Sequence, residues 1–115
     1  MKYIRTKDGI YEVEKKERAY FEGHPWLYCC KGKYELVEEK DIIKQADTIE
    51  ELCDYYIVFD NEEHCSITKD YGDFLEIFYE CQRHCWLDKA YGAIKTSRGL
   101  IYVAKMNEKG ELELL

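Results

Sequence analysis

The sequence predicts an α+β fold: a mainly antiparallel sheet of short hairpins, covered by one longer and one short helix. Two observations carry this prediction. Short runs rich in β-branched and aromatic residues are separated by glycine-containing turns along most of the chain, which indicates strands joined antiparallel. Two segments, 48–56 and 73–86, instead place apolar residues at helical spacing. The length of 115 residues fits a single α+β domain that spans residues 1–115.

The opening of the chain predicts a hairpin followed by a loop. Residues 2–6 and 10–14 alternate between the two sides of a strand, and the turn between them contains Asp8-Gly9, where glycine accepts the positive φ of a tight turn. The polar residues 15–25 predict a loop, and Pro25 prevents a helix from continuing into the next segment.

Two further elements are expected before the first helix. Residues 26–30 and 34–37 flank a Lys-Gly-Lys turn and predict a second hairpin, which is aromatic and rich in cysteine. The segment 41–44, with Ile42 and Ile43 as its apolar pair, fits either a strand or a single turn.

Each predicted helix has its own signal. Thr48 and Glu51 have the spacing of a capping box, in which the hydroxyl accepts a backbone N–H while the glutamate reaches back to another. The longer helix has acidic residues near its start and Arg83 with His84 near its end, as the helix dipole prefers. We expect this longer helix to lie across the sheet.

The remaining runs predict the other strands, at 57–59, 64–68, 93–96, 100–106 and 111–115. The segment that begins at Tyr91 repeats the pattern of the chain's opening, with Arg5 and Lys95 at matched positions. We therefore expect the first and last hairpins to be neighbours in one sheet.

The formal net charge of −7 is concentrated in the middle of the chain, where residues 34–80 carry three Lys/Arg against fifteen Asp/Glu. This distribution disfavours direct binding of nucleic acid, whose affinity depends on neutralised phosphates. It favours a basic surface on a partner protein. The predicted contact residues are Glu38, Glu39, Asp41, Glu50, Glu51, Asp54, Glu62 and Glu63. The alternative is a solvated face that only keeps the chain soluble.

The matched cations suggest a second kind of site. Neighbouring first and last hairpins would gather cations and tyrosine rings into a small basic pocket, which would suit a nucleotide-sized anion. The predicted ligand-binding residues are Arg5, Lys7, Tyr11, Lys95, Arg98 and Tyr102. The alternative is that these hairpin tips are simply solvated.

Catalytic and metal sites are not expected. Cysteine and histidine are residue types that bind zinc, and Cys81, His84 and Cys85 would lie on one side of the predicted helix. The paired C-x-x-C motifs of a closed zinc site are, however, absent from the sequence. We therefore expect free thiols, no metal and no cofactor. Nucleophile signatures and phosphate-binding glycine motifs are also absent, so the chain is predicted not to be an enzyme.

Apolar runs in the sequence are short. None approaches the roughly 20 residues of a membrane helix, and the N-terminus turns polar before a signal-peptide core forms. A cytoplasmic protein without a membrane partner is therefore expected, and in a reducing compartment the six cysteines remain thiols. The sequence leaves open whether the chain forms a homo-oligomer.

Three segments carry a resemblance: YIRTKDGIYEV, IIKQADTIEELCD and YGAIKTSRGLIYVAKMNEKGELELL. They resemble a family of small, uncharacterised accessory proteins encoded in phages and prophages of Firmicutes-type bacteria. The resemblance implies a protein that acts inside the bacterial host cell, where such proteins often blunt a host factor, including defence systems. The expected function is binding and modulation of a host or phage protein, such as a nucleic-acid-handling or defence factor, through an acidic aromatic surface. The alternative is sequestration of a nucleotide-type signal.

Overall fold

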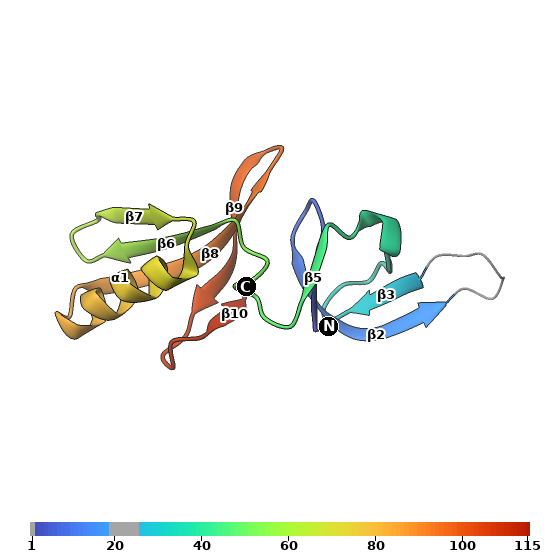
Figure 1. Ribbon diagram of the computed structural model, residues 1–115, viewed down its shortest axis with the longest axis horizontal. Coiled ribbons are helices and arrows are strands. Elements are labelled where there is room, and N and C mark those ends of the chain that lie inside the picture. The colour runs from blue at the N-terminus through green and yellow to red at the C-terminus, as the bar shows by residue number, and fades with distance from the viewer. Residues whose placement is uncertain (1, 19–25) are drawn as a thin grey trace. The chain divides into compact units, whose positions relative to one another are not determined.

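The computed structural model describes residues 2–18 and 26–115, and the chain divides into two compact units, 1–52 and 53–115. Each unit is built on its own five-stranded antiparallel sheet (Figure 1). The first and last hairpins therefore belong to different sheets, and the expectation that they are neighbours in one sheet is wrong. The single domain over 1–115 stays a prediction, and each unit is described by itself.

The sheet of the first unit has the strand order β4-β3-β2-β1-β5. Its strands are β1 (Tyr3–Arg5), β2 (Ile10–Arg18), β3 (Trp26–Cys30), β4 (Val37–Glu38) and β5 (Lys44–Ala46). A single 3-10 turn, η1 (Glu39–Asp41), connects β4 to the segment before β5. The predicted element at 41–44 therefore divides between the end of this turn and the start of an edge strand.

The first predicted hairpin is confirmed. Arg5 lies opposite Ile10, and the Thr6 N–H donates to the Gly9 carbonyl at 2.9 Å to close the turn. Strand β2 extends to Arg18, so the first residues of the predicted 15–25 loop are in fact strand. The rest of that predicted loop, 19–25, lies outside the described residues.

The core of the first unit comes from residues on one side of its strands. Ile4, Tyr28, Cys30 and Val37 form a buried cluster, in which Ile4 is fully enclosed. Tyr28 pairs with Val37 across β3 and β4, so both side chains point to the same face of the sheet. The alternation expected for a sheet with one buried face is thus present.

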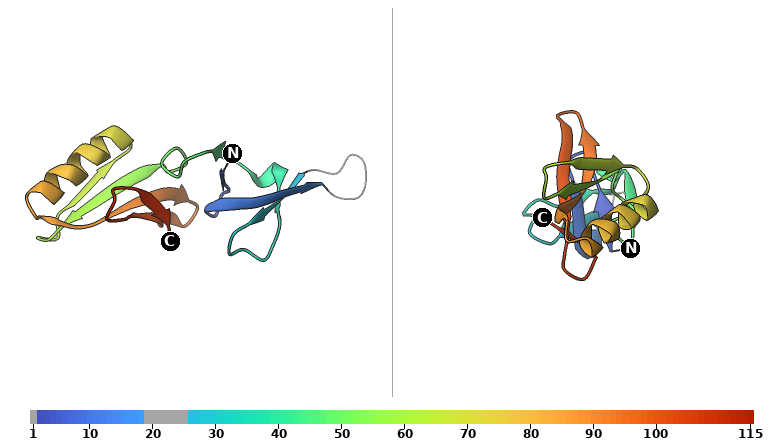
Figure 2. Two further views of the ribbon diagram at one scale, coloured as in Figure 1. Left: turned by 90° about the horizontal axis from the view of Figure 1, so that it is seen from below. Right: turned by 90° about the vertical axis from the view of Figure 1, so that its left-hand side faces the viewer.

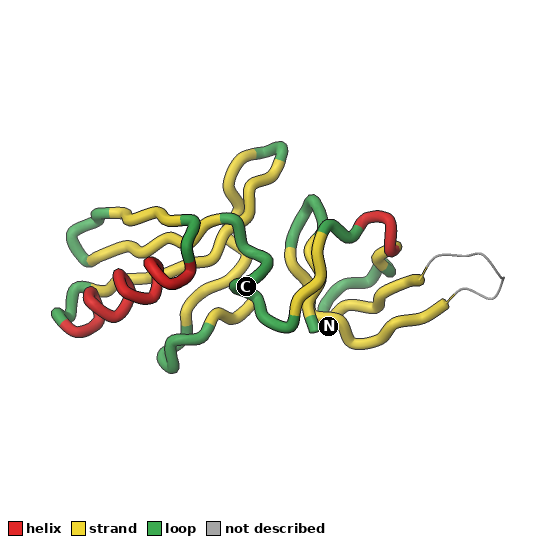
Figure 3. The backbone as a smooth tube through the Cα atoms, in the orientation of Figure 1, coloured by secondary structure: helices red, strands yellow, loops and turns green. Residues whose placement is uncertain are grey.

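The second unit has the strand order β10-β9-β8-β6-β7 and one α-helix (Figure 3). Its elements are β6 (Tyr55–Asp60), β7 (Cys65–Thr68), α1 (Tyr71–Arg83), β8 (Leu87–Thr96), β9 (Gly99–Met106) and β10 (Leu112–Leu114). The predicted strands in this unit are confirmed, although β8 begins six residues before the predicted 93–96 run. The fold is therefore dominated by its two sheets.

Helix α1 confirms the longer predicted helix and lies along one face of its sheet (Figure 2). Phe74 and Phe78 are buried there, and the Phe74 ring stacks on Tyr56 of β6 with centroids 5.2 Å apart. After the helix, Cys85 takes a positive φ of 57°, which turns the chain back towards β8. None of the helices in the described part of the chain is both long and apolar enough to cross a membrane.

The predicted short helix over 48–56 is wrong. Residues 48–52 form turns, and Tyr55 and Tyr56 belong to strand β6. The two residues of the predicted capping box bond to each other instead of to backbone N–H groups, since the Thr48 hydroxyl donates to the Glu51 carboxylate at 2.8 Å. A helix this short is marginal on its own, and the aromatic and β-branched run from Tyr55 gains more by pairing in a sheet.

The Asp70 cap of α1 gives a first testable prediction. Its carboxylate accepts hydrogen bonds from the backbone N–H of Gly72 at 2.7 Å and of Asp73 at 3.3 Å. Asp70→Ala leaves these donors without their partner and is expected to lower the free energy of unfolding by about 1 kcal/mol. Urea denaturation followed by circular dichroism measures this loss, with Asp73→Ala as the control on the same turn. Equal stability of Asp70→Ala and the parent protein would contradict the cap.

Candidate functional site

An aromatic cluster lies on the sheet of the second unit. The rings of Tyr91 and Tyr102 stack with centroids 4.6 Å apart and an interplanar angle of 5°. Phe59 packs edge-on against both, at 6.1 Å from Tyr91 and 6.4 Å from Tyr102. Together with Ile67, these residues make up what we call the aromatic face.

The strand registers explain why these side chains meet. Ile57 pairs with Ile67 on one side and with Tyr91 on the other, so all three project to the same side of the sheet. Phe59 follows Ile57 by two residues and therefore points the same way. Tyr56 projects to the opposite side, where α1 covers it. The aromatic face is thus the side of the sheet that α1 leaves uncovered.

Side chains of the aromatic face are packed against one another and partly exposed to solvent. Tyr102 exposes 43% of its surface and Ile67 exposes 56%. On the same side of the sheet, the neighbouring side chains of Ile57 and Ala93 are almost completely buried. Rigid, partly exposed aromatic side chains lose little conformational entropy when a partner covers them, and they are enriched at protein interfaces.

The predicted acidic contact residues do not form one patch. Glu38, Glu39, Asp41, Glu50 and Glu51 belong to the first unit, whereas Asp54, Glu62 and Glu63 belong to the second. Some have local roles: Lys40 pairs with Glu38 at 3.3 Å, and the Asp54 carboxylate accepts the Lys95 backbone N–H at 2.8 Å. Asp54 precedes β6 while Glu62 and Glu63 follow it, so these acids flank the two ends of a strand that lies in the aromatic face.

The predicted ligand-binding residues are also divided. Arg5, Lys7 and Tyr11 lie in the first unit, and Lys95, Arg98 and Tyr102 in the second. The neighbours of β1 are β2 and β5, whereas those of β8 are β6 and β9. The matched cations are therefore not on adjacent strands, and the reason for grouping them is removed. The echo between the two segments reflects similar hairpins in separate sheets.

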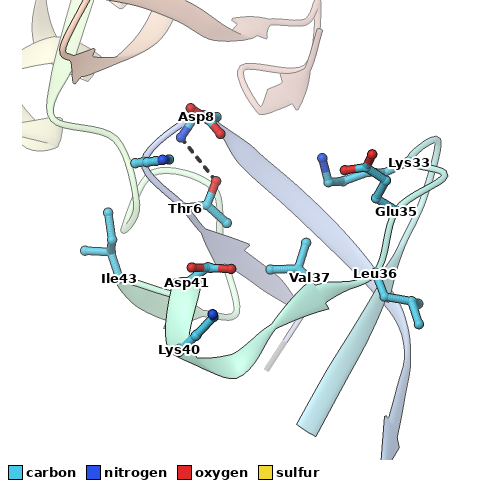
Figure 4. A pocket seen from close by; sticks show the side chains of 10 residues that line it. Thr6, Asp8, Lys33, Glu35, Leu36, Val37, Lys40, Asp41 and Ile43 are labelled. Atoms are coloured by element: carbon cyan, nitrogen blue, oxygen red, sulfur yellow. Dashed lines mark hydrogen bonds between the residues drawn. The ribbon is translucent and has the colours of Figure 1, made fainter. Parts of the chain in front are cut away.

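A pocket of about 420 Å³ is present in the first unit and contains one predicted ligand residue, Lys7 (Figure 4). Its lining residues are Thr6, Lys7, Asp8, Lys33, Glu35, Leu36, Val37, Lys40, Asp41 and Ile43. Three lysines are thus balanced by three carboxylates. Figure 4 labels Lys33, Glu35, Lys40 and Asp41 among these charged lining residues. An even balance of charge gives this pocket no strong preference for an anion.

The cysteine and histidine residues do not assemble a metal site: no group of three or more suitable side chains occurs within 2–18 and 26–115. His84 stacks on Trp86 with centroids 4.4 Å apart and contacts the Glu80 carboxylate at 3.0 Å. Burial raises the pKa of the Cys81 thiol, with nearby Asp60 and Glu80 acting in the same direction. The protonated thiol is the weaker nucleophile and the weaker metal ligand.

The free cysteines give a second prediction. Cys65 and Cys85 are exposed, whereas Cys30 is 2% exposed, and burial also raises the pKa of its thiol. Iodoacetamide labelling of the native protein, mapped by mass spectrometry, is expected to modify Cys30 more slowly than Cys65 by a factor on the order of a hundred or more, because Cys30 must first be uncovered. Labelling in urea is the control, where the difference should disappear. Equal native rates would contradict the buried position of Cys30.

The fold and the aromatic face define a small α+β protein with a preformed, partly apolar surface. No protein-family model, curated protein or solved structure matches the chain. Tyr102 was selected from the sequence for a different site, while Phe59 and Tyr91 were missed. The available signal was the set of three aromatic residues in strand-like runs, but only the registers show that they meet.

Proposed function

We propose that the chain is a non-enzymatic accessory protein that binds and modulates a host or phage protein through the aromatic face. The observation that carries this proposal is the stacked Tyr91–Tyr102 pair on the side of the sheet opposite α1. Three packed rings from three strands form an amphipathic patch, in which the rings supply apolar contact and the tyrosine hydroxyls supply hydrogen bonds. Such patches are typical of the energetic centre of an interface.

The proposed partner has a basic surface around its contact site. Residues 53–115 carry seven Lys/Arg against twelve Asp/Glu, and Asp54, Glu62 and Glu63 flank the ends of β6. Acidic side chains around an apolar centre steer and orient a basic partner. Proteins that handle nucleic acid carry basic surfaces of this kind, which supports the proposal of a nucleic-acid-handling or defence factor. The family resemblance supports a bacterial host cell as the setting.

The proposal predicts that one added charge on the aromatic face strongly weakens binding. Tyr102→Lys places a cation in the centre of the surface that meets the basic partner, and we expect affinity to fall by at least about 30-fold, since loss of a central aromatic residue costs about 2 kcal/mol or more. The measurement is quantitative capture from lysate of a Firmicutes-type host, comparing proteins retained by the parent and the variant. Titration of the captured protein by calorimetry then gives the affinity.

The matched control is Tyr34→Lys, which makes the same chemical change at a fully exposed tyrosine of the first unit. We expect Tyr34→Lys to retain what the parent protein retains. If both variants capture the same proteins as the parent, or if the parent captures none specifically, the proposal fails.

A second candidate is binding of a small nucleotide-type ligand, supported by the pocket that contains Lys7. Its volume of about 420 Å³ falls in the range of small-molecule sites. Its balanced charge makes it the weaker candidate. A thermal-shift screen against nucleotides tests it, because a ligand that binds only the folded state raises the melting temperature. A shift that Lys7→Ala removes would support the pocket, and no shift with any nucleotide would exclude this function.

A further inference from the structure

Strand β7 differs from the other sheet edges of the described structure because it carries no charged residue. The edge strands are β4 and β5 in the first unit and β10 and β7 in the second. Glu38, Lys44 and Glu113 place a charge on the first three, whereas β7 consists of Cys65, Ser66, Ile67 and Thr68. Charged side chains on an edge discourage pairing with another chain. Strand β7 lacks this protection and has a β-branched residue, Ile67, exposed by 56%.

The backbone of β7 also has groups that are free to pair. The Asp60 N–H donates to the His64 carbonyl at 3.0 Å, which fixes the hydrogen-bonded positions of the β6–β7 ladder. Because such positions alternate along an antiparallel pair, the N–H and C=O groups of Cys65 and Ile67 point away from β6. Within the second unit, no described strand lies beyond β7 in the sheet. An added strand would satisfy these outward groups.

We propose that β7 pairs antiparallel with β7 of a second copy of the chain, which joins two sheets into one across a twofold axis. In the register that uses all the outward groups, Cys65 exchanges hydrogen bonds with Ile67 of the second copy, and Ile67 with its Cys65. Ser66 then lies opposite Ser66 of the second copy, at a non-hydrogen-bonded position. The pairing is isologous, as a closed dimer requires.

The residues around β7 favour a second copy as the occupant, because the edge is complementary to itself. Ile67 would pack against Cys65 of the second copy, which covers an exposed apolar side chain. Glu63 lies in the turn before β7 and Lys69 directly follows the strand, so antiparallel pairing places a residue of opposite charge near each end of the paired strands. The twofold axis runs perpendicular to the sheet, so the two aromatic faces would become one continuous surface with both α1 helices on the other side.

Light scattering after size exclusion tests the dimer at micromolar concentrations. The parent chain of 13.8 kDa should elute with twice that mass. Ile67→Lys adds a charge to the edge and should give a monomer, whereas Ile101→Lys, at an exposed isoleucine of β9, should remain dimeric. A monomeric parent protein, or a dimer that Ile67→Lys leaves intact, would overturn the proposal.

Cross-linking tests the register and does not depend on how Ile67→Lys folds. Non-hydrogen-bonded partners have Cα atoms about 4.5 Å apart, which a disulfide can span. In a chain with Cys65→Ser and Cys85→Ser, the substitution Ser66→Cys should form a covalent dimer on mild oxidation. Glu113→Cys in the same background, on edge strand β10, is the control and should remain monomeric. Equal cross-linking of both variants, or none with Ser66→Cys, would overturn the proposed pairing.

Discussion

Replacing Phe74 with alanine is expected to destabilise the second unit by about 3–5 kcal/mol. Phe74 is fully buried in α1, where it stacks on Tyr56 at 5.2 Å and contacts Tyr71 and Phe78 with ring centroids 5.8 Å and 6.4 Å away. Removing the ring leaves a cavity between the helix and the sheet that the neighbouring rings cannot fill. A loss of this size is a large part of the 5–15 kcal/mol that typically stabilises a domain.

Urea denaturation monitored by helical circular dichroism at 222 nm measures this loss. Since α1 is the one α-helix in the described residues, this signal reports mainly on the second unit. Glu76→Ala, at an exposed position of α1, is the control and should change the free energy of unfolding by less than about 0.5 kcal/mol. A loss below about 1 kcal/mol for Phe74→Ala would show that the helix does not depend on this packing.

Gly92→Ala is expected to destabilise the second unit by about 1–3 kcal/mol, although it adds only a methyl group. A Cβ at Gly92 would lie 2.7 Å from the Cys53 sulfur, 3.5 Å from Leu112 Cδ1 and 3.6 Å from Ala104 Cβ. The surrounding strands are buried, since Ala104 and Ala93 expose no surface. The added carbon therefore forces the start of the unit and strand β8 apart.

The close contact with Cys53 provides a direct check. Cys53→Ala removes the sulfur that the new methyl group would meet, so Gly92→Ala should cost less in the Cys53→Ala background than in the parent protein. Urea denaturation of the two single variants and the double variant forms a double-mutant cycle. Strict additivity of the two losses would contradict the contact as the cause.

Local features of the fold were predictable from the sequence because they depend on neighbours in the chain. The Asp8-Gly9 turn, the hairpin at β6–β7 and the helix around Phe74 and Phe78 all follow from short-range patterns. Thr48 and Glu51 show the limit of this reasoning. Their side chains hydrogen-bond to each other, but sheet pairing by the following aromatic run decides the conformation.

Features that depend on distant parts of the chain were not predictable in this way. The similarity of the segments around Arg5 and Lys95 suggested adjacent hairpins, yet which strands pair is decided by whole-unit packing. The aromatic face needs residues from four strands, brought together by registers that include a shift between Gly92 and Ala93. Such an irregularity moves every later side chain relative to its partner strand. No local pattern in the sequence predicts it.

The sequence correctly indicates an excess of acidic residues, but it does not show where these residues lie in the fold. The excess of acidic residues remains in both units, with a larger net negative charge in residues 53–115. The individual acids, however, lie at strand ends and turns, where Asp54 also binds the backbone of Lys95. Asp54, Glu62 and Glu63, at the two ends of β6, have positions that suit the rim of the proposed interface better than its centre.

Photo-cross-linking from position 102 tests the central claim most directly. The cross-linking amino acid p-benzoylphenylalanine replaces Tyr102 in one variant and Tyr34 in another, and both are irradiated in host cells. We predict a discrete covalent adduct with a protein of basic surface from position 102 and no such adduct from position 34. Adducts of equal pattern from both positions, or none from position 102, would contradict the claim that the aromatic face is a protein-binding surface.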